Sequence, residues 1–148
     1  MRKGRRLCLD PGSARIGVAV SDVDGILASP RPAVPAGAWE AIRGVLNDVE
    51  PLEIIVGLPV GLDGLEGQAA RSAREFAAHL STVTSLPIRF VDERLSTVQA
   101  QRGFHDQGRS IRHSRDMIDS ASAAVVLQYA LDAERTSGAP PGEVHVER

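Results

Sequence analysis

Residues 5–22 constrain the fold of this chain more than any other stretch, because they predict a strand, a tight turn and a second strand. Positions 7–9 and 16–20 are short apolar runs, and the second is rich in β-branched residues, as is typical of strands. A Pro-Gly-Ser sequence between them favours a turn. The first strand therefore ends on a carboxylate, Asp10, at the edge of a sheet. A buried unpaired carboxylate is costly, so Asp10 is a metal ligand, part of a phosphate-binding loop, or the cap of the turn.

The rest of the chain alternates between strand-like and helix-like patterns. Strands are expected at 26–29, 53–58 and 88–91, and helices at 38–49, 68–80, 96–102 and 114–134. Strands joined by short turns pair antiparallel, whereas strands separated by helices pair parallel through right-handed crossovers. The order therefore predicts an α/β fold, a mixed five-stranded sheet with helices on both faces. Residues 1–134 are expected to form this single domain, with a mobile loop at 103–113 and a disordered tail at 135–148.

The composition limits the classes of protein to which the chain can belong. Hydrophobic residues make up 43% and charged residues 24% of the 148 positions, as in an ordinary globular domain. A net charge of −2 argues against a uniformly basic nucleic-acid binder, and aromatic residues, at 3%, offer few rings for stacking on bases. One cysteine excludes a disulfide framework. No apolar run is long enough for a signal peptide or a membrane span, so we expect a cytoplasmic protein.

Acidic residues stand at three separate places that the predicted topology can bring together. Asp10 ends the first strand, Asp92 and Glu93 end the last one, and Asp116 and Asp119 share a face in the first turns of the final helix. The neighbours of Asp119 are apolar and small, which indicates the boundary of a buried face. Carboxylates converging from separate elements are what Mg²⁺ or Mn²⁺ requires. Two such ions about 3.5–4 Å apart can hydrolyse a phosphodiester bond.

Basic and hydroxyl side chains lie close to these acids in the sequence. Residues 101–115 carry four arginines and a single aspartate, a pattern that favours binding of a phosphate backbone. The alternative is a solvated loop without such a role. Other cationic and hydroxyl groups flank the acids themselves. The candidates for substrate binding are Arg15, Arg94, Ser96, Thr97, Arg109 and Arg112.

Four motifs, in order along the chain, resemble the YqgF (RuvX) family. They are Asp10-Pro11-Gly12 with Arg15-Ile16-Gly17, then Gly57-Leu58-Pro59, then Asp92-Glu93-Arg94-Leu95-Ser96-Thr97, and finally Ile118-Asp119. The resemblance covers residues 7–131 and departs from the family at Cys8, where the family usually has glycine. It implies an RNase H-like fold and a nuclease that processes the 5′ end of the 16S rRNA precursor, or alternatively a Holliday junction resolvase.

The same resemblance implies the site and its partners. The catalytic acids that also hold Mg²⁺ or Mn²⁺ are Asp10, Glu93 and Asp119. Nucleic acid is the expected partner, and the protein is expected to be a monomer or a weak homodimer that does not bind membranes. Two other functions stay open. Asp10-x-Gly-x4-Gly also resembles the phosphate loop of actin-like ATP-binding proteins, although these need two lobes, and an inactive RNA-binding scaffold is the third hypothesis.

The strand order expected for this fold, 3-2-1-4-5, creates a problem of distance. The fifth strand lies two places from the first, so roughly 9.5–10 Å separate them. Glu93 must then reach across the fourth strand to share a metal with Asp10, and Gly57 leaves space there. Asp92 is the competing candidate, but consecutive strand residues face opposite ways. We therefore favour Glu93 over Asp92 as the residue that faces the site.

Overall fold

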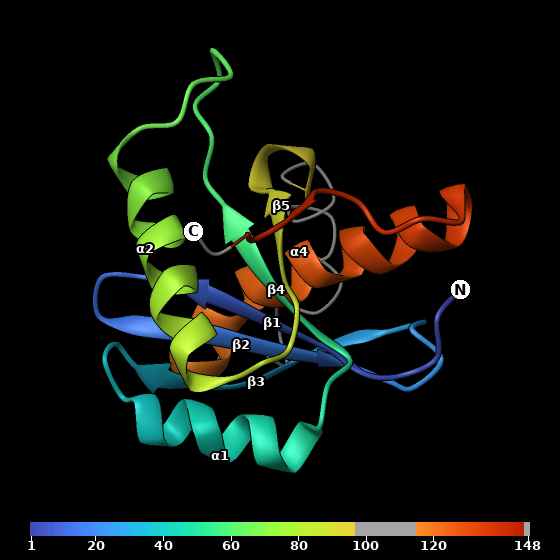
Figure 1. The fold of residues 1–148 in the computed structure, drawn as a ribbon, viewed down its shortest axis with the longest axis horizontal. Helices are drawn as coiled ribbons and strands as arrows, with labels where there is room; N and C mark the ends of the chain where they lie inside the picture. The colour runs from blue at the N-terminus through green and yellow to red at the C-terminus, as the bar shows by residue number, and fades with distance from the viewer. Residues whose placement is uncertain (97–114, 147–148) are drawn as a thin grey trace.

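The computed structural model describes residues 1–96 and 115–146, which form one sheet covered by helices (Figure 1). The strands are β1 (Arg6–Pro11), β2 (Arg15–Ser21), β3 (Ala28–Pro35), β4 (Glu53–Leu58), β5 (Ile88–Asp92) and β6 (Glu143–Val144). The helices are α1 (Trp39–Val49), α2 (Gln68–Val83), the short 3-10 helix η1 (Glu93–Ser96) and α4 (Arg115–Ser137). Within these described ranges no helix is long and apolar enough to cross a membrane.

The strand order β3-β2-β1-β4-β5-β6 confirms the predicted fold class and the predicted order of the first five strands. β1 pairs antiparallel with β2 and parallel with β4, and β4 pairs parallel with β5. Because β1, β4 and β5 run in the same direction, their carboxyl ends meet at one edge of the sheet. Side chains that follow these three strands are therefore collected at that edge.

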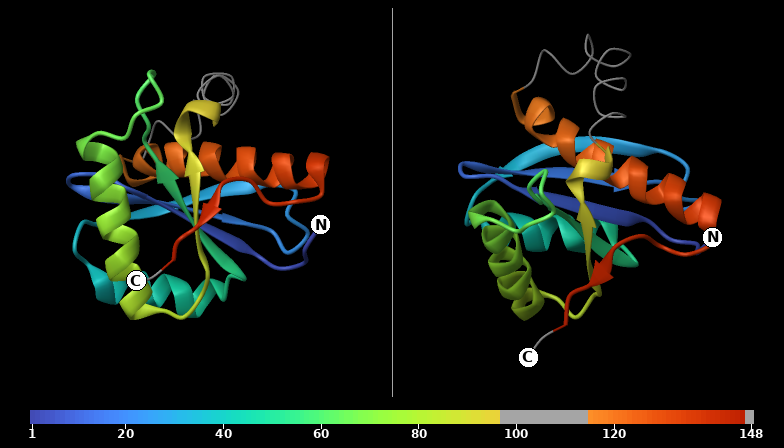
Figure 2. Two further views of the ribbon diagram at one scale, coloured as in Figure 1. Left: turned by 45° about the horizontal axis from the view of Figure 1, so that its top comes forward. Right: turned by 90° about the horizontal axis from the view of Figure 1, so that it is seen from above.

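Alternate residues of β1 show why both faces of the sheet need a cover. Leu7 and Leu9 are fully buried in an apolar cluster with residues of α1 and α2, whereas Cys8 packs in a second cluster with α4. Successive side chains of a strand point to opposite faces, so one apolar strand supplies both clusters. Burying each leucine contributes about 2 kcal/mol. Figure 2 shows α1 and α2 on one side of the sheet and α4 on the other.

The sixth strand corrects the prediction that residues 135–148 are disordered. α4 continues to Ser137, and β6 then pairs antiparallel with β5, while the backbone N–H of His145 donates to the carbonyl of Ile88 at 2.7 Å. An edge strand offers unpaired backbone groups, and the returning chain satisfies those of β5. Gly142, at φ +80°, lies so close to the carbonyl oxygen of Phe90 that a Cβ there would overlap it. The predicted helix at 96–102 and loop at 103–113 lie, apart from Ser96, outside the described residues.

β3 is longer than the strand predicted at 26–29, and it runs through prolines. It pairs only with β2, and Pro30 and Pro35 stand opposite Ala19 and Arg15. An edge strand tolerates proline because only one of its sides needs backbone donors. The pairing of β2 with β3 is irregular at one place, where the register shifts between Ile16 and Val18.

A buried cluster of charged side chains lies at the opposite end of the parallel strands from Asp10. Arg2 Nη2 donates to Glu53 Oε1 at 2.8 Å and to Glu134 Oε1 at 2.6 Å. Arg6 donates to Glu134 at 3.1 Å, and Arg89 donates to Glu53 at 3.2 Å. Both glutamates are almost fully buried, so each needs its cationic partners. This cluster joins the first residues of β1 and β4 to α4 and the N-terminal segment.

Candidate active site

Asp10 and Glu93 come together at the carboxyl ends of β1 and β5. Burial raises the pKa of the Asp10 carboxyl to about 8, with further contributions from the charge of Glu93 and from a hydrogen bond between the two side chains. Two carboxylates in contact repel each other when both are ionised, and a proton or a cation between them would relieve this repulsion. Such a pair of oxygen donors suits a divalent metal ion, which would take the place of the proton.

Gly57 of β4 makes this contact possible. It stands between the two acid-bearing strands, and a Cβ at this position would overlap Glu93 Oε1 and lie 3.1 Å from Glu93 Cδ. The glutamate side chain therefore crosses β4 through the space that glycine leaves. This confirms the predicted path of Glu93 toward Asp10, although its catalytic role stays a prediction.

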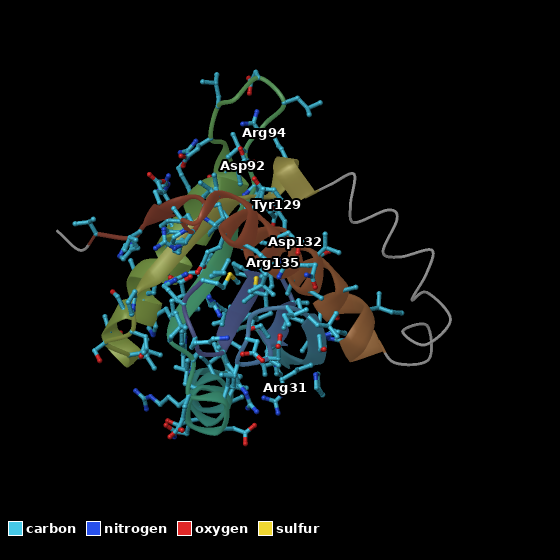
Figure 3. All side chains as sticks on the ribbon, turned by 90° about the vertical axis from the view of Figure 1, so that its right-hand side faces the viewer. Arg31, Asp92, Arg94, Tyr129, Asp132 and Arg135 are labelled. Atoms are coloured by element: carbon cyan, nitrogen blue, oxygen red, sulfur yellow. The ribbon has the colours of Figure 1, made fainter. Side chains whose placement is uncertain are left out.

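Asp92 faces away from Asp10, as the pleat of the strand requires. Its Oδ2 accepts from Arg94 Nη2 at 2.7 Å, and the two side chains lie together in Figure 3. Hydrogen bonds from Arg94 hold the pKa of Asp92 below its usual value. Arg94 also donates to the carbonyl of Gly61 at 3.1 Å and lines neither of the cavities that contain Asp10. In this structure Arg94 therefore braces the β4–α2 loop, and its predicted contact with substrate stays a prediction.

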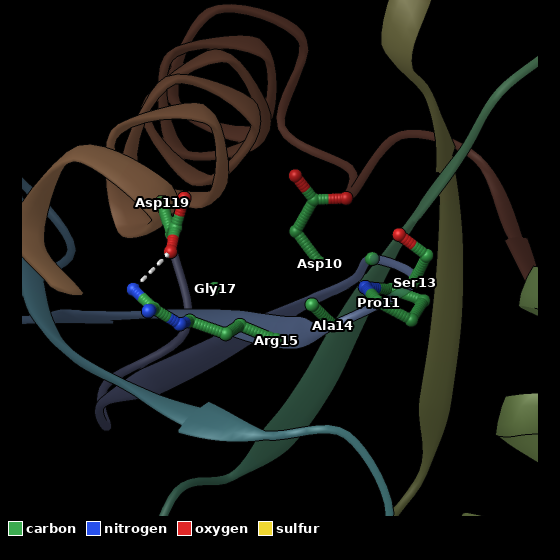
Figure 4. A pocket seen from close by; sticks show the side chains of 8 residues that line it. Asp10, Pro11, Ser13, Ala14, Arg15, Gly17 and Asp119 are labelled. Carbon is green, nitrogen blue, oxygen red and sulfur yellow. Dashed lines mark hydrogen bonds and ion pairs between the residues drawn. The ribbon is translucent and has the colours of Figure 1, made fainter. Parts of the chain in front are cut away.

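Asp119 lies across a cavity from Asp10. This cavity, of about 410 Å³, is lined by Asp10, residues 11–14, Arg15, Gly17 and Asp119 (Figure 4). Arg15 Nη1 donates to Asp119 Oδ2 at 3.0 Å, and both side chains are about one-third exposed. The sequence-predicted residues Asp10, Arg15 and Asp119 therefore share one cavity, with Asp119 engaged by an arginine.

Close packing of α4 on β2 fixes the position of Asp119. A Cβ on Gly17 would lie 2.5 Å from the carbonyl oxygen of Asp119, so only glycine allows the helix to come this near. The next residue, Ser120, is fully buried, and its Oγ accepts from the backbone N–H of Val18 at 3.0 Å. Ser120 was not among the residues predicted from the sequence, although a serine on an apolar helix face is a signal for such a bond.

The structure brings two of the three predicted acids into contact and keeps the third across the cavity. Among the described residues, no group of three histidine, cysteine, aspartate or glutamate side chains is arranged to hold a metal ion. Thr97, Arg109 and Arg112 lie outside the described residues, and so do the side chains of Ser96 and Asp116. Their predicted roles in substrate or metal binding are therefore not placed.

A second cavity next to the acid pair was missed in the sequence analysis. It has a volume of about 700 Å³ and is lined by Asp10 and Glu93 as well as by Trp39, Phe76 and His79. No local pattern in the sequence indicated that α1 and α2 bring these rings together. That contact depends on residues more than 35 positions apart.

The fold and the acids at its edge define a nuclease of the RNase H-like class. The features that support this assignment are the sheet order, the acids at the ends of β1 and β5, and the final helix, which places a further aspartate across the cavity from Asp10. The RuvX family, described as Holliday junction resolvase, matches residues 4–133. The chain belongs to this family.

Relatives and solved structures agree with this assignment. A protein of Streptomyces coelicolor is 47% identical over 148 residues, covering 97% of this chain and 89% of its own length, and one of Nocardioides sp. is 47% identical over 152 residues, covering 97% of both. Both are named, provisionally, as pre-16S rRNA nucleases. Thermus thermophilus RuvC in complex with a Holliday junction substrate has a TM-score of 0.54 at 17% identity, covering 96% of this chain and 99% of that one, which shows a shared fold. Nucleases of this fold class generally depend on divalent metal ions.

Proposed function

We propose that this protein is a metal-dependent nuclease that processes the 5′ end of the 16S rRNA precursor in the cytoplasm. The observation that carries the proposal is the contact between Asp10 and Glu93 across Gly57. A glycine that lets two acids from non-adjacent strands meet has no use in a purely structural sheet, because a buried carboxyl pair is unfavourable without a cation. The names of the relatives from Streptomyces and Nocardioides support the choice of RNA substrate.

Mg²⁺ or Mn²⁺ is the proposed cofactor, held by Asp10, Glu93 and Asp119. Bound there, the ion would activate water and stabilise the leaving oxygen during phosphodiester hydrolysis. The contact pair Asp10 and Glu93 fits such an ion, because both side chains offer hard oxygen donors and a cation would balance their negative charges. Asp119, which lies across the cavity from Asp10, is the third proposed ligand. Arg15 lines the cavity that contains Asp10 and Asp119, which supports the proposal that it contacts the substrate phosphate.

Holliday junction resolution is the second candidate function. The description of the matching family supports it. Symmetric cleavage of a junction needs two active sites, so this function requires a homodimer, whereas rRNA processing is compatible with the monomer or weak homodimer that we propose here. The ATP-binding hypothesis is weaker, because actin-like proteins hold the nucleotide between two lobes, whereas the described residues form one sheet covered by helices.

The test is cleavage of end-labelled 16S precursor RNA and of a labelled four-way DNA junction, side by side, with Mn²⁺ or EDTA. We expect metal-dependent cleavage of the RNA and little cleavage of the junction. Asp10→Asn, which removes a charge but keeps the shape, should abolish cleavage while leaving the circular dichroism spectrum unchanged. Full activity of a folded Asp10→Asn protein would show that the acid pair is not the metal site, and preference for the junction would favour resolution.

A further inference from the structure

The cavity of about 700 Å³ beside the acid pair contains aromatic rings that metal-dependent hydrolysis does not use. Asp10 and Glu93 line it together with Trp39, Phe76 and His79. Its size falls within the roughly 300–1,000 Å³ that is usual for sites that bind small molecules. A group bound among these rings would therefore lie in the same cavity as the acids that we assign to hydrolysis.

The ring of Trp39 stacks on both of the other two rings. The ring of Trp39, the first residue of α1, lies 4.1 Å from that of His79 and 5.3 Å from that of Phe76, with interplanar angles of 25° and 24°. Phe76 and His79 are one turn apart on α2, so both approach the indole from the same helix. We call these three side chains the aromatic wall.

Core packing explains only part of the aromatic wall. Trp39 and Phe76 are half-buried and pack against the apolar cluster beneath α1 and α2. His79 is exposed, and no packing requirement places an imidazole on the indole. The whole chain has only five phenylalanine, tryptophan and tyrosine residues, and two of them border this one cavity.

The charge of the cavity indicates which part of a nucleic acid fits there. Among the residues that the structure describes, its lining includes the acids Asp10, Glu75 and Glu93 and no lysine or arginine. A phosphate would be repelled by these carboxylates, except where a metal ion stands between them. An uncharged planar base would meet aromatic rings, and such stacking favours every base because each one has a π-face.

We propose that the aromatic wall binds the base of a nucleotide next to the scissile phosphate. This inference rests on the proposed nuclease function, because it assumes a nucleic-acid chain at the acid pair. The wall then fixes where the chain lies relative to Asp10 and Glu93, and it requires that this nucleotide be unpaired, since a base within a duplex has no free face. Single-stranded RNA at the end of a precursor meets that requirement.

Trp39 provides a direct readout, because it is the only tryptophan in the chain. The experiment titrates the intact protein with a six-nucleotide oligoadenylate, in EDTA and again in Ca²⁺, and follows tryptophan fluorescence. The comparison probe is an abasic ribose-phosphate chain of the same length, which carries the same phosphates without bases. We expect a saturable fluorescence change with oligoadenylate, and binding of the abasic chain weaker by roughly 5- to 100-fold.

Variants then separate stacking from simple packing. His79→Ala should weaken oligoadenylate binding by ~5-fold or more, measured by anisotropy of a labelled oligonucleotide, and should leave abasic-chain binding unchanged. Thr82→Ala is the matched control, because Thr82 is also exposed on α2 but does not line the cavity. Its hydroxyl donates to the backbone carbonyl of His79, a group that the His79→Ala variant keeps. Urea unfolding of each variant shows that the fold is kept.

Equal binding of the two chains, or no fluorescence change on binding, would overturn the inference. If neither His79→Ala nor removal of the bases changes metal-dependent cleavage of precursor RNA, the inference about the aromatic wall is wrong. The proposed nuclease function would still stand in that case. Loss of the proposed function would appear differently, as the absence of metal-dependent cleavage of any nucleic acid by the wild-type protein.

Discussion

Replacing Glu134 by glutamine should destabilise the protein by roughly 3 kcal/mol at neutral pH. Glu134 is almost fully buried on α4 and accepts hydrogen bonds from Arg2 at 2.6 Å and from Arg6 at 3.1 Å. These contacts, with that of Arg2 the largest, lower the pKa of Glu134 from 4.5 to about 2. Each pKa unit corresponds to about 1.4 kcal/mol, so the ionised carboxylate contributes roughly 3 kcal/mol. Breaking a buried ion pair typically costs about 3–5 kcal/mol, which agrees.

The lowered pKa of Glu134 determines in which direction its contribution to stability changes with pH. Since the pKa of Glu134 is lower in the folded protein than in the unfolded chain, its stabilisation is complete above the unfolded pKa of about 4.5. The stabilisation is lost as the pH falls toward about 2, because the carboxyl then becomes protonated in both states. The unfolding free energies of the wild type and of Glu134→Gln should therefore converge between pH 5 and about 2.

The measurement is urea unfolding followed by circular dichroism at pH 7 and at steps down to pH 3. A thermal scan should show a Tm lower by roughly 6–12 °C, at about 2–4 °C per kcal/mol for a chain of this size. The control is Glu40→Gln, the same chemical change in an exposed ion pair with Arg43, which should cost less than ~0.5 kcal/mol. The reasoning would be refuted if the unfolding free energy of Glu134→Gln lies within ~1 kcal/mol of the wild-type value at pH 7. It would also be refuted if the difference between the two values does not change with pH.

Three further predictions concern the proposed site and its substrate. Glu93→Gln should lower the cleavage rate by at least ~100-fold and Asp92→Asn by far less, and the reverse ranking in a single-turnover assay would show that the wrong acid faces the metal. Gly57→Ala should keep stability within ~1 kcal/mol, because the three atoms nearest to the added Cβ all belong to the flexible Glu93 side chain, yet it should lower cleavage strongly; unchanged cleavage would contradict the path of Glu93. Changing Arg109 and Arg112 to alanine together should reduce the log–log salt slope of binding by ~1.4–1.8, and an unchanged slope would mean that the substrate is gripped elsewhere.

The sequence by itself determined the first five strands, most of the helices and the position of each acid along them. These features depend on local patterns, namely apolar runs, turn residues and helical periodicity, which a single stretch of chain displays. The facing of Glu93 followed from the alternation of side chains along a strand, and the need for Gly57 followed from the spacing of strands. Motif order then added the expectation of the RNase H-like fold.

The tertiary structure alone decided the features that depend on contacts between distant residues. β6 forms because β5 needs a partner for its open edge, and two residues of a glycine- and proline-rich segment carry no strand pattern of their own. β3 keeps its prolines because β2 is its single neighbour.

The aromatic wall and the charge cluster have the same origin. Trp39 and His79 meet only once α1 and α2 pack on the same face of the sheet, and Arg2 meets Glu134 across 132 positions of the chain. Neither pairing has a local signal, since the free energy of each contact is gained only when both partners are already held by the rest of the fold. Position along a strand can thus be read from sequence, whereas the partner across a cavity is set by packing.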